Sequence, residues 1–66
     1  MLDTEHVDIC RDGPSGFVVT VNDARGSVPV WWDADFEQAA GLAERFRSAL
    51  RIEAPVRDLV TVAGHG

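Results

Sequence analysis

The sequence predicts a small α+β domain with the element order β-β-β-α-β. Two turn-forming stretches, DGPSG and NDARGS, separate three segments in which apolar residues alternate with other residues, a pattern typical of strands joined by hairpins. A segment with apolar residues at helical spacing follows, and a last apolar segment comes after Pro55. We expect the 66 residues to form one domain, 1–66, with a small core, because so short a chain buries only ~60% of its unfolded surface.

The first two predicted strands each have one apolar face and one mixed face. They span 4–11 and 17–22, on either side of the DGPSG turn. The apolar face carries Val7, Ile9, Phe17, Val19 and Val21. The opposite face carries His6, Asp8, Cys10, Val18, Thr20 and Asn22. A single helix covers only one face of such a sheet, so we expect the mixed face to be open.

The third predicted strand, 28–32, follows the NDARGS turn, in which Gly26 suits a left-handed position. Pro29 lies within this strand, and a proline has no N–H to donate to a ladder. The third strand is therefore expected at an edge of the sheet. Pro29 thus restricts the possible strand orders to those in which the third strand lies at an edge.

Both tryptophans of the chain stand side by side in this strand. Because neighbouring strand residues point to opposite faces, only one indole is expected in the core, and the phase of the strand decides which one. The simplest phase buries Trp32 on the face shared with Val28 and Val30. Trp31 then lies over the sheet edge, where an exposed aromatic side chain favours a binding site.

The predicted helix starts after Asp33, its expected N-cap, and carries further negative charge at Asp35 and Glu37 in its first turn. Its apolar stripe consists of Phe36, Ala39, Ala40, Ala43, Phe46 and Leu50. Pro55 is expected to end the helix near Ala54. Capping explains the acidic cluster at the helix start without a bound ion.

A fourth strand is predicted over 56–63, with residues 63–66 as a frayed tail. The helix between the third and fourth strands makes a crossover connection. Placing the fourth strand parallel to the first gives the strand order 3-2-1-4. In this order the third strand is an edge, in agreement with Pro29.

Composition narrows the class of protein. The net charge is −5 and the chain contains no lysine, so a basic stripe for direct nucleic-acid binding is excluded. A single cysteine, Cys10, forms no internal disulfide and indicates a reducing compartment. No apolar run approaches the ~18 residues of a membrane span, and the acidic start is unlike a signal peptide. We expect a cytoplasmic protein of a high-GC bacterium or of its phage.

The spacing of the candidate residues argues against both catalysis and metal binding. His6 and Cys10 lie four positions apart on one strand, about 13 Å, whereas a nucleophile and its base must approach to ~3 Å. The same geometry argues against a site built from these two residues and Asp8. His65 meets His6 only by accident of folding, and DGPSG opens a hairpin without a lysine, unlike a phosphate loop. We therefore predict no enzyme activity, cofactor, metal or small-molecule ligand.

The open face and the tryptophan edge favour a non-enzymatic protein-interaction domain that binds another protein or a second copy of itself. The expected contact residues are Trp31, Pro29, Val18, Thr20, His6 and Asp8. An alternative function is mimicry of nucleic acid toward a basic DNA-binding protein. The acidic residues for that role are Asp3, Glu5, Asp8, Asp12, Asp33, Asp35 and Glu37.

The run VDICRDGPSGFVVTVNDARGSVPVWWDADFEQAAGLAERF resembles the small HicB-type antitoxins, which have a partial ribonuclease-H-like fold. The resemblance covers about two thirds of the chain and lies in the element order, the turn placement and the acidic, alanine-rich helix start DADFEQAA. The resemblance implies a non-catalytic domain that neutralises a toxin by direct contact. An antitoxin-like protein or a phage-encoded inhibitor of another protein is therefore an alternative form of the interaction domain.

Overall fold

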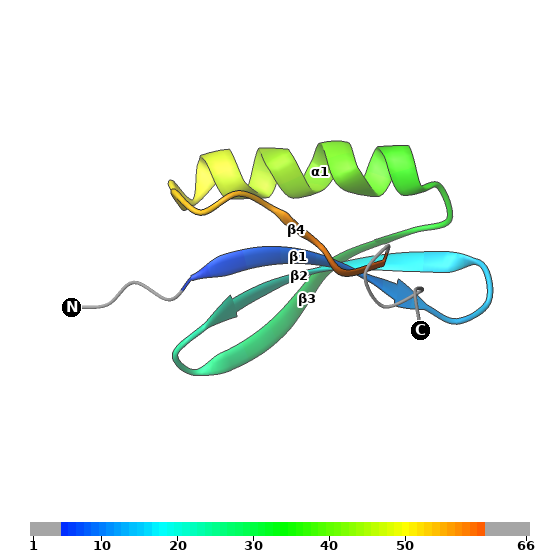
Figure 1. Cartoon of the computed structure of the whole chain (residues 1–66), viewed down its shortest axis with the longest axis horizontal. Coiled ribbons are helices and arrows are strands. Elements are labelled where there is room, and N and C mark those ends of the chain that lie inside the picture. The colour runs from blue at the N-terminus through cyan, green and yellow to red at the C-terminus, as the bar shows by residue number, and fades with distance from the viewer. Residues whose placement is uncertain (1–4, 61–66) are drawn as a thin grey trace.

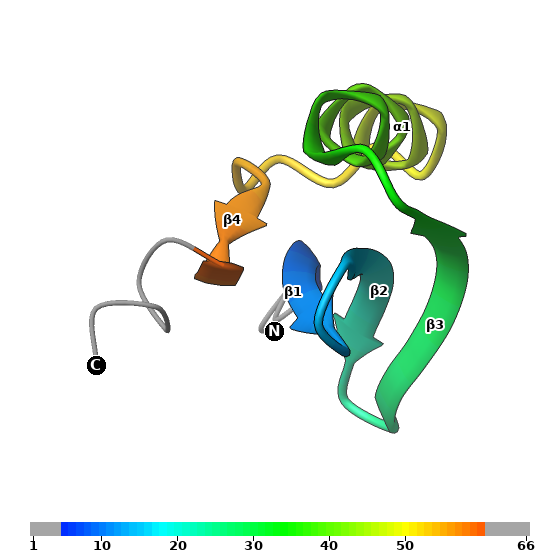
Figure 2. The same ribbon diagram turned by 90° about the vertical axis from the view of Figure 1, so that its right-hand side faces the viewer.

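The computed structural model describes residues 5–60 and confirms the predicted topology. Four strands form one sheet in the order β3-β2-β1-β4. The elements are β1 (His6–Asp12), β2 (Gly16–Asp23), β3 (Gly26–Asp33), α1 (Phe36–Ala49) and β4 (Arg57–Asp58). The helix crosses one face of the sheet, and the other face is left open (Figures 1 and 2).

Two hairpins join β1, β2 and β3 into an antiparallel meander. The first closes where Asp12 pairs with Gly16. The second closes where Asp23 pairs with Gly26, whose φ of 136° only a glycine adopts readily. The Asp23 carboxylate accepts the backbone N–H groups of Arg25 and Gly26 at 2.7 and 3.2 Å, which stabilises the turn.

A β-bulge in β3 changes the predicted placement of the tryptophans. The β2–β3 register shifts between Val19 and Thr20, so that Thr20 pairs with Pro29 and Val19 pairs with Trp31. One extra residue of β3, Val30, lies in between and inverts the alternation beyond it. Trp31 therefore belongs to the helix side of the sheet and Trp32 to the open face.

The expectation that Trp32 enters the core with Val28 and Val30 is wrong for Trp32 and for the exposed Val28, and only Val30 of these three residues packs against the core. Trp32 is 52% exposed, and Trp31 is 44% exposed, so neither indole is buried. Two physical reasons combine. The bulge turns Trp32 to the face that no helix covers, and the edge position of β3 leaves Trp31 outside the area over which α1 packs.

The helix begins two residues later than predicted. Asp35, and not Asp33, is the N-cap, and its carboxylate accepts the N–H of Glu37 at 3.0 Å. The Asp33 carboxylate instead accepts the N–H of Asp35 at 2.9 Å, which shapes the turn between β3 and α1. Asp33 thus stabilises the turn before the helix, and Asp35 caps the helix itself.

The helix also ends earlier than Pro55 requires. Arg51 has a positive φ of 58°, its N–H bonds to the Ser48 carbonyl, and the N–H of Ile52 bonds to the Arg47 carbonyl. This pair of bonds is a Schellman motif, which stops a helix without a proline. It leaves Leu50 at the C-cap, 50% exposed, rather than in the apolar stripe.

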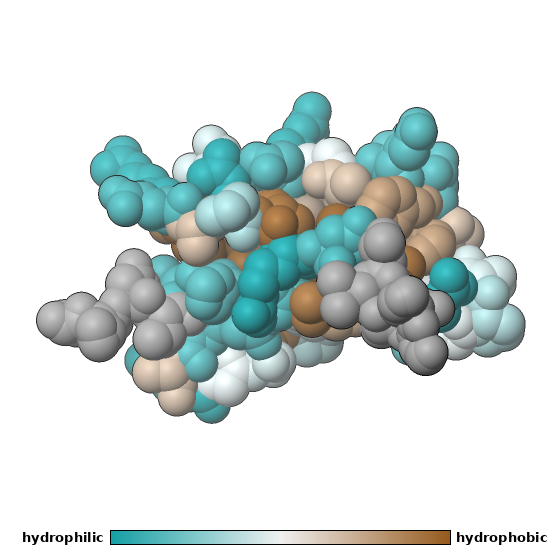
Figure 3. Space-filling model, in the orientation of Figure 1, coloured by the Kyte–Doolittle hydropathy of each residue, from teal (hydrophilic) through white to brown (hydrophobic). Residues whose placement is uncertain are grey.

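The core lies between α1 and the apolar face of the sheet. Hydrophobic side chains gather there, while the outer side of α1 is hydrophilic (Figure 3). The fully buried members are Val7, Ile9, Val19, Ala39, Ala43 and Ile52. Ile52 was not predicted, because the Schellman motif directs it back under the helix end. The two helical alanines let α1 approach the sheet closely.

The fourth strand is shorter than predicted. Among residues 5–60, Arg57 and Asp58 alone pair with β1 in parallel, opposite Asp8 and Ile9. The backbone turns into a helical conformation at Leu59, where the Asp58 carboxylate accepts the N–H of Val60 at 3.0 Å. Residues 61–63 of the predicted strand, the predicted tail 63–66 with His65, and Asp3 of the predicted acidic surface lie outside the described residues. Within 5–60, no helix has the length and apolar character needed to cross a bilayer.

Candidate functional site

The exposed apolar surface of the described chain concentrates on β3. Six of the eight residues of this strand are exposed. Val28, Trp31 and Trp32 are among the most exposed large hydrophobic residues, at 57%, 44% and 52%. In Figure 2, β3 forms the outer edge of the sheet on the side away from β4. The strand therefore presents both an unpaired backbone edge and two indoles.

Trp31 stands on the helix side of this edge and is held in place. Its indole Nε1–H donates to the Asp33 carboxylate at 3.3 Å, and the second oxygen of that carboxylate accepts the N–H of Asp35. The only polar atom of the indole is thereby satisfied within the chain. The hydrocarbon part of the ring remains exposed and oriented, as in a side chain that anchors a protein contact.

Trp32 stands on the open face and lies across the start of β2. A Cβ built on Gly16 would lie 2.6 Å from Trp32 Nε1, so the indole occupies the space above this glycine. Val18 is the direct cross-strand neighbour of Trp32. The predicted contact residues Thr20 and Pro29 form the next pair on this face. Val18 and Thr20 are half-buried and Pro29 is exposed.

A polar network crosses the rest of the open face through all four strands. Arg57 donates from Nε and Nη2 to the two carboxylate oxygens of Asp8, at 2.7 and 2.9 Å. Asn22 donates to Asp8 at 2.5 Å and accepts a hydrogen bond from Ser27. The ion pair holds β4 against β1, where only two residue pairs make the ladder.

Asp8, a predicted contact residue, is only 4% exposed. Its carboxylate lies beneath Arg57, which leaves little of it for a partner to touch. Arg57, which holds this carboxylate, was not predicted from the sequence. The available signal was Asp8 itself, because a carboxylate between two buried strand residues needs a cation nearby.

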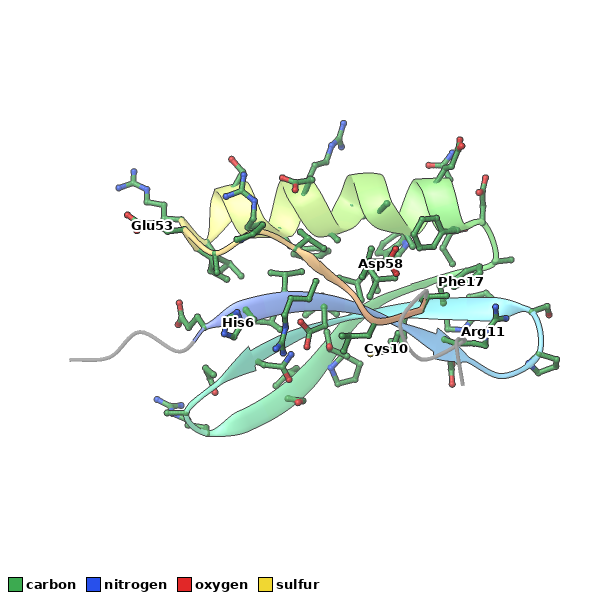
Figure 4. The ribbon with its side chains drawn as sticks, in the orientation of Figure 1. His6, Cys10, Arg11, Phe17, Glu53 and Asp58 are labelled. Carbon is green, nitrogen blue, oxygen red and sulfur yellow. The ribbon has the colours of Figure 1, made fainter. Side chains whose placement is uncertain are left out.

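His6 and Cys10 lie at different points along β1, and Figure 4 shows their side chains apart. His6 is half-buried, and its buried Nδ1 has no hydrogen-bond partner among the described residues. Partial burial and the neighbouring Asp8 carboxylate raise the pKa of Cys10, while the charge of Arg57 opposes this rise. The hydrogen bond to Asp8 also raises the pKa of Arg57. Within 5–60, no three His, Cys, Asp or Glu side chains are placed to share a metal ion.

The acidic residues of the β3–α1 turn have structural partners. Asp33 binds the Trp31 indole and the turn, and Asp35 caps the helix. Glu37 is exposed in the first helical turn, where negative charge stabilises the helix dipole. The three residues still leave a local excess of negative charge beside the tryptophans.

A shallow hollow on α1 is lined by Gln38, Gly41, Leu42 and Arg45, without a carboxylate, thiol or imidazole. The exposed β3 strip, formed by Val28, Trp31 and Trp32, therefore has the strongest features of a recognition surface.

Comparison of this chain with the models of known protein families, with curated proteins and with solved structures finds no match.

Proposed function

We propose that this chain is a non-enzymatic protein-interaction domain that binds a protein partner through the open sheet face and the β3 edge. The observation that carries the proposal is the placement of the two tryptophans. Trp31 and Trp32 are exposed on opposite faces of one edge strand. A segment that pairs with β3 would be flanked by an indole on each side, as in partner recognition by strand addition.

The energetics favour binding by this strip. Roughly half of each indole is exposed, which amounts to about 200 Å² of aromatic surface in total and roughly 5 kcal/mol if it became fully buried. Both rings are already oriented, Trp31 by Asp33 and Trp32 by packing over Gly16. Little further rotamer entropy is lost when they bind, so more of this free energy contributes to affinity.

Neutralisation of a toxin, which the likeness to HicB-type antitoxins implies, and inhibition of another protein by a phage-encoded inhibitor are special cases of this function. In both cases the partner is a foreign protein and the contact itself is the activity. Pro29 and the bulge limit how many residues of a partner strand can pair continuously with β3. Specificity would then rest on the indoles more than on the backbone ladder.

The test is capture of partners from a lysate of the organism that encodes the protein, followed by mass spectrometry. Wild type is compared with Trp31→Ser and Trp32→Ser. The control is Leu50→Ser, which removes a side chain of similar exposure, 50%, at the end of α1. We expect the tryptophan variants to lose the partner and the control to retain it. Equal capture by all four proteins would contradict the proposal.

The salt dependence of the captured complex separates this function from nucleic-acid mimicry. A contact anchored by indoles is insensitive to added salt, because burial of apolar surface does not depend on screened charges. A complex that instead dissociates between ~0.1 and ~0.5 M salt, and that tolerates Trp31→Ser, would favour recognition of the acidic surface around Asp35 and Glu37.

A further inference from the structure

The exposed residues of β3 have a spacing that lets them pair with those of a second copy related by a two-fold axis. We propose that the partner of β3 is the β3 of a second copy, paired antiparallel so that Val28 of each copy lies opposite Trp31 of the other. This proposal rests on the proposed function, because it names the partner of the same surface. In Figure 2 no described element lies beyond β3, so a second sheet has access to this edge.

The bulge makes this register consistent with the faces of the sheet. In an antiparallel pair, residues directly opposite each other share a face. Val28 pairs with Val21 and Trp31 with Val19, so both lie on the helix side despite their odd separation in sequence. In the same register Ser27 lies opposite Trp32, and both belong to the open face. Without the bulge, the two residues of each pair would lie on opposite faces of the sheet.

Pro29 lies beside the two-fold axis, opposite the bulged Val30 of the second copy, and this central pair does not share a face because Val30 packs against its own core. Because proline has no N–H, the ladder between the copies is interrupted only there. Two short stretches remain on either side of the axis, each pairing 26–28 of one copy with 31–33 of the other. The proline therefore shortens the ladder between the copies without preventing this contact.

Charge complementarity also favours a second copy as the partner. The register places the turn residue Arg25 next to Asp33 and Asp35 of the other copy. Among the described residues the Arg25 guanidinium has no carboxylate partner, whereas the acidic turn has an excess of negative charge. Two such contacts, one at each end, would offset the repulsion between chains of net charge −5.

The size of the contact predicts a weak dimer. The six exposed residues of β3 and the adjoining turns would bury roughly 1,000 Å² in total, at the low end of specific interfaces. We therefore expect dissociation in the range of roughly 10–100 μM. The mass of 7.2 kDa for one chain makes monomer and dimer easy to separate by light scattering or sedimentation equilibrium.

The test compares Arg25→Glu with Arg45→Glu by sedimentation equilibrium. Both variants change the net charge by the same amount, but Arg45 lies on α1, beside the hollow described above. We expect Arg25→Glu to weaken the dimer at least tenfold more than Arg45→Glu does. Equal effects of the two variants would overturn the proposed register.

A cross-linking experiment tests the register directly. Val28→Cys and Trp31→Cys proteins, each also carrying Cys10→Ser, are mixed at high concentration and oxidised. Opposite residues of antiparallel strands lie within disulfide distance, so the mixture should form a linked heterodimer. Absence of this heterodimer, or equal linking within Val28→Cys alone, would contradict the proposal.

Two outcomes separate this proposal from the proposed function. A monomer at all concentrations, together with tryptophan-dependent capture of another protein, overturns the second copy as the partner and leaves the interaction surface in place. A dimer of unchanged affinity in both Trp31→Ser and Trp32→Ser overturns the surface itself.

Discussion

Replacing Gly16 with alanine tests how Trp32 is held on the open face. An alanine Cβ at this position would lie 2.6 Å from Trp32 Nε1 and closer still to two carbons of the ring. The indole must therefore leave its place on β2. Roughly half of its surface is buried, so the lost packing is at most about 2–3 kcal/mol. Replacing a glycine offsets about 0.4–1 kcal/mol of this through the unfolded state.

We expect Gly16→Ala to lower the free energy of unfolding by about 1–2 kcal/mol. Urea unfolding followed by far-ultraviolet circular dichroism measures this change, and a Trp31→Phe background reports the emission of Trp32 alone. The emission should shift to the red as the ring moves into water. The control is Gly41→Ala on α1, where nothing lies within 4 Å of the new Cβ. This control should stabilise the fold by roughly 0.5–1 kcal/mol.

A double-mutant cycle completes the test. In a Trp32→Ala background, Gly16→Ala has no ring to displace and should be neutral or slightly stabilising. The same destabilisation with and without the indole would refute the packing of Trp32 over Gly16.

Three further predictions concern the helix ends and the ion pair. Arg51→Gly should stabilise the fold by about 1 kcal/mol in urea unfolding, because Arg51 has a φ of 58°; a loss of stability would show that its side chain contributes more than the strain costs. Asp35→Ala should cost about 1 kcal/mol by the same measurement through loss of the N-cap, and no cost would contradict the cap assignment. The raised pKa of Cys10 should move its alkylation by iodoacetamide to higher pH than for a free cysteine. Arg57→Ala should raise that pKa further and Asp8→Asn should lower it, whereas shifts of the opposite sign would contradict the described charges.

The strand order was predictable from the sequence because its determinants are local. Alternation places Val7, Ile9 and Val19 on one face, and Pro29 requires an edge strand. The bulge was not predictable. No local residue marks Val30 as the extra position, and its cost depends on how the two hairpin strands twist against each other. This one residue decides the face on which each tryptophan lies.

The helix end and the ion pair escaped prediction for related reasons. A Schellman motif usually has glycine in its left-handed position. Here Arg51 occupies that position, so the sequence carries no glycine signal for the helix end. The ion pair between Asp8 and Arg57 depends on a parallel register between segments 49 positions apart. The open face and an exposed aromatic side chain at the β3 edge could be expected from the sequence. The exposure of both indoles required the structure.

The proposed binding surface of this domain is β3. Amide hydrogen exchange tests it most directly, comparing the isolated chain at low concentration with the complex, either the dimer at high concentration or the chain with a captured partner. We expect slower exchange within Gly26–Asp33 and little change in α1 or β4. Slower exchange confined to α1 or to the β1–β4 edge, with β3 unchanged, would contradict it.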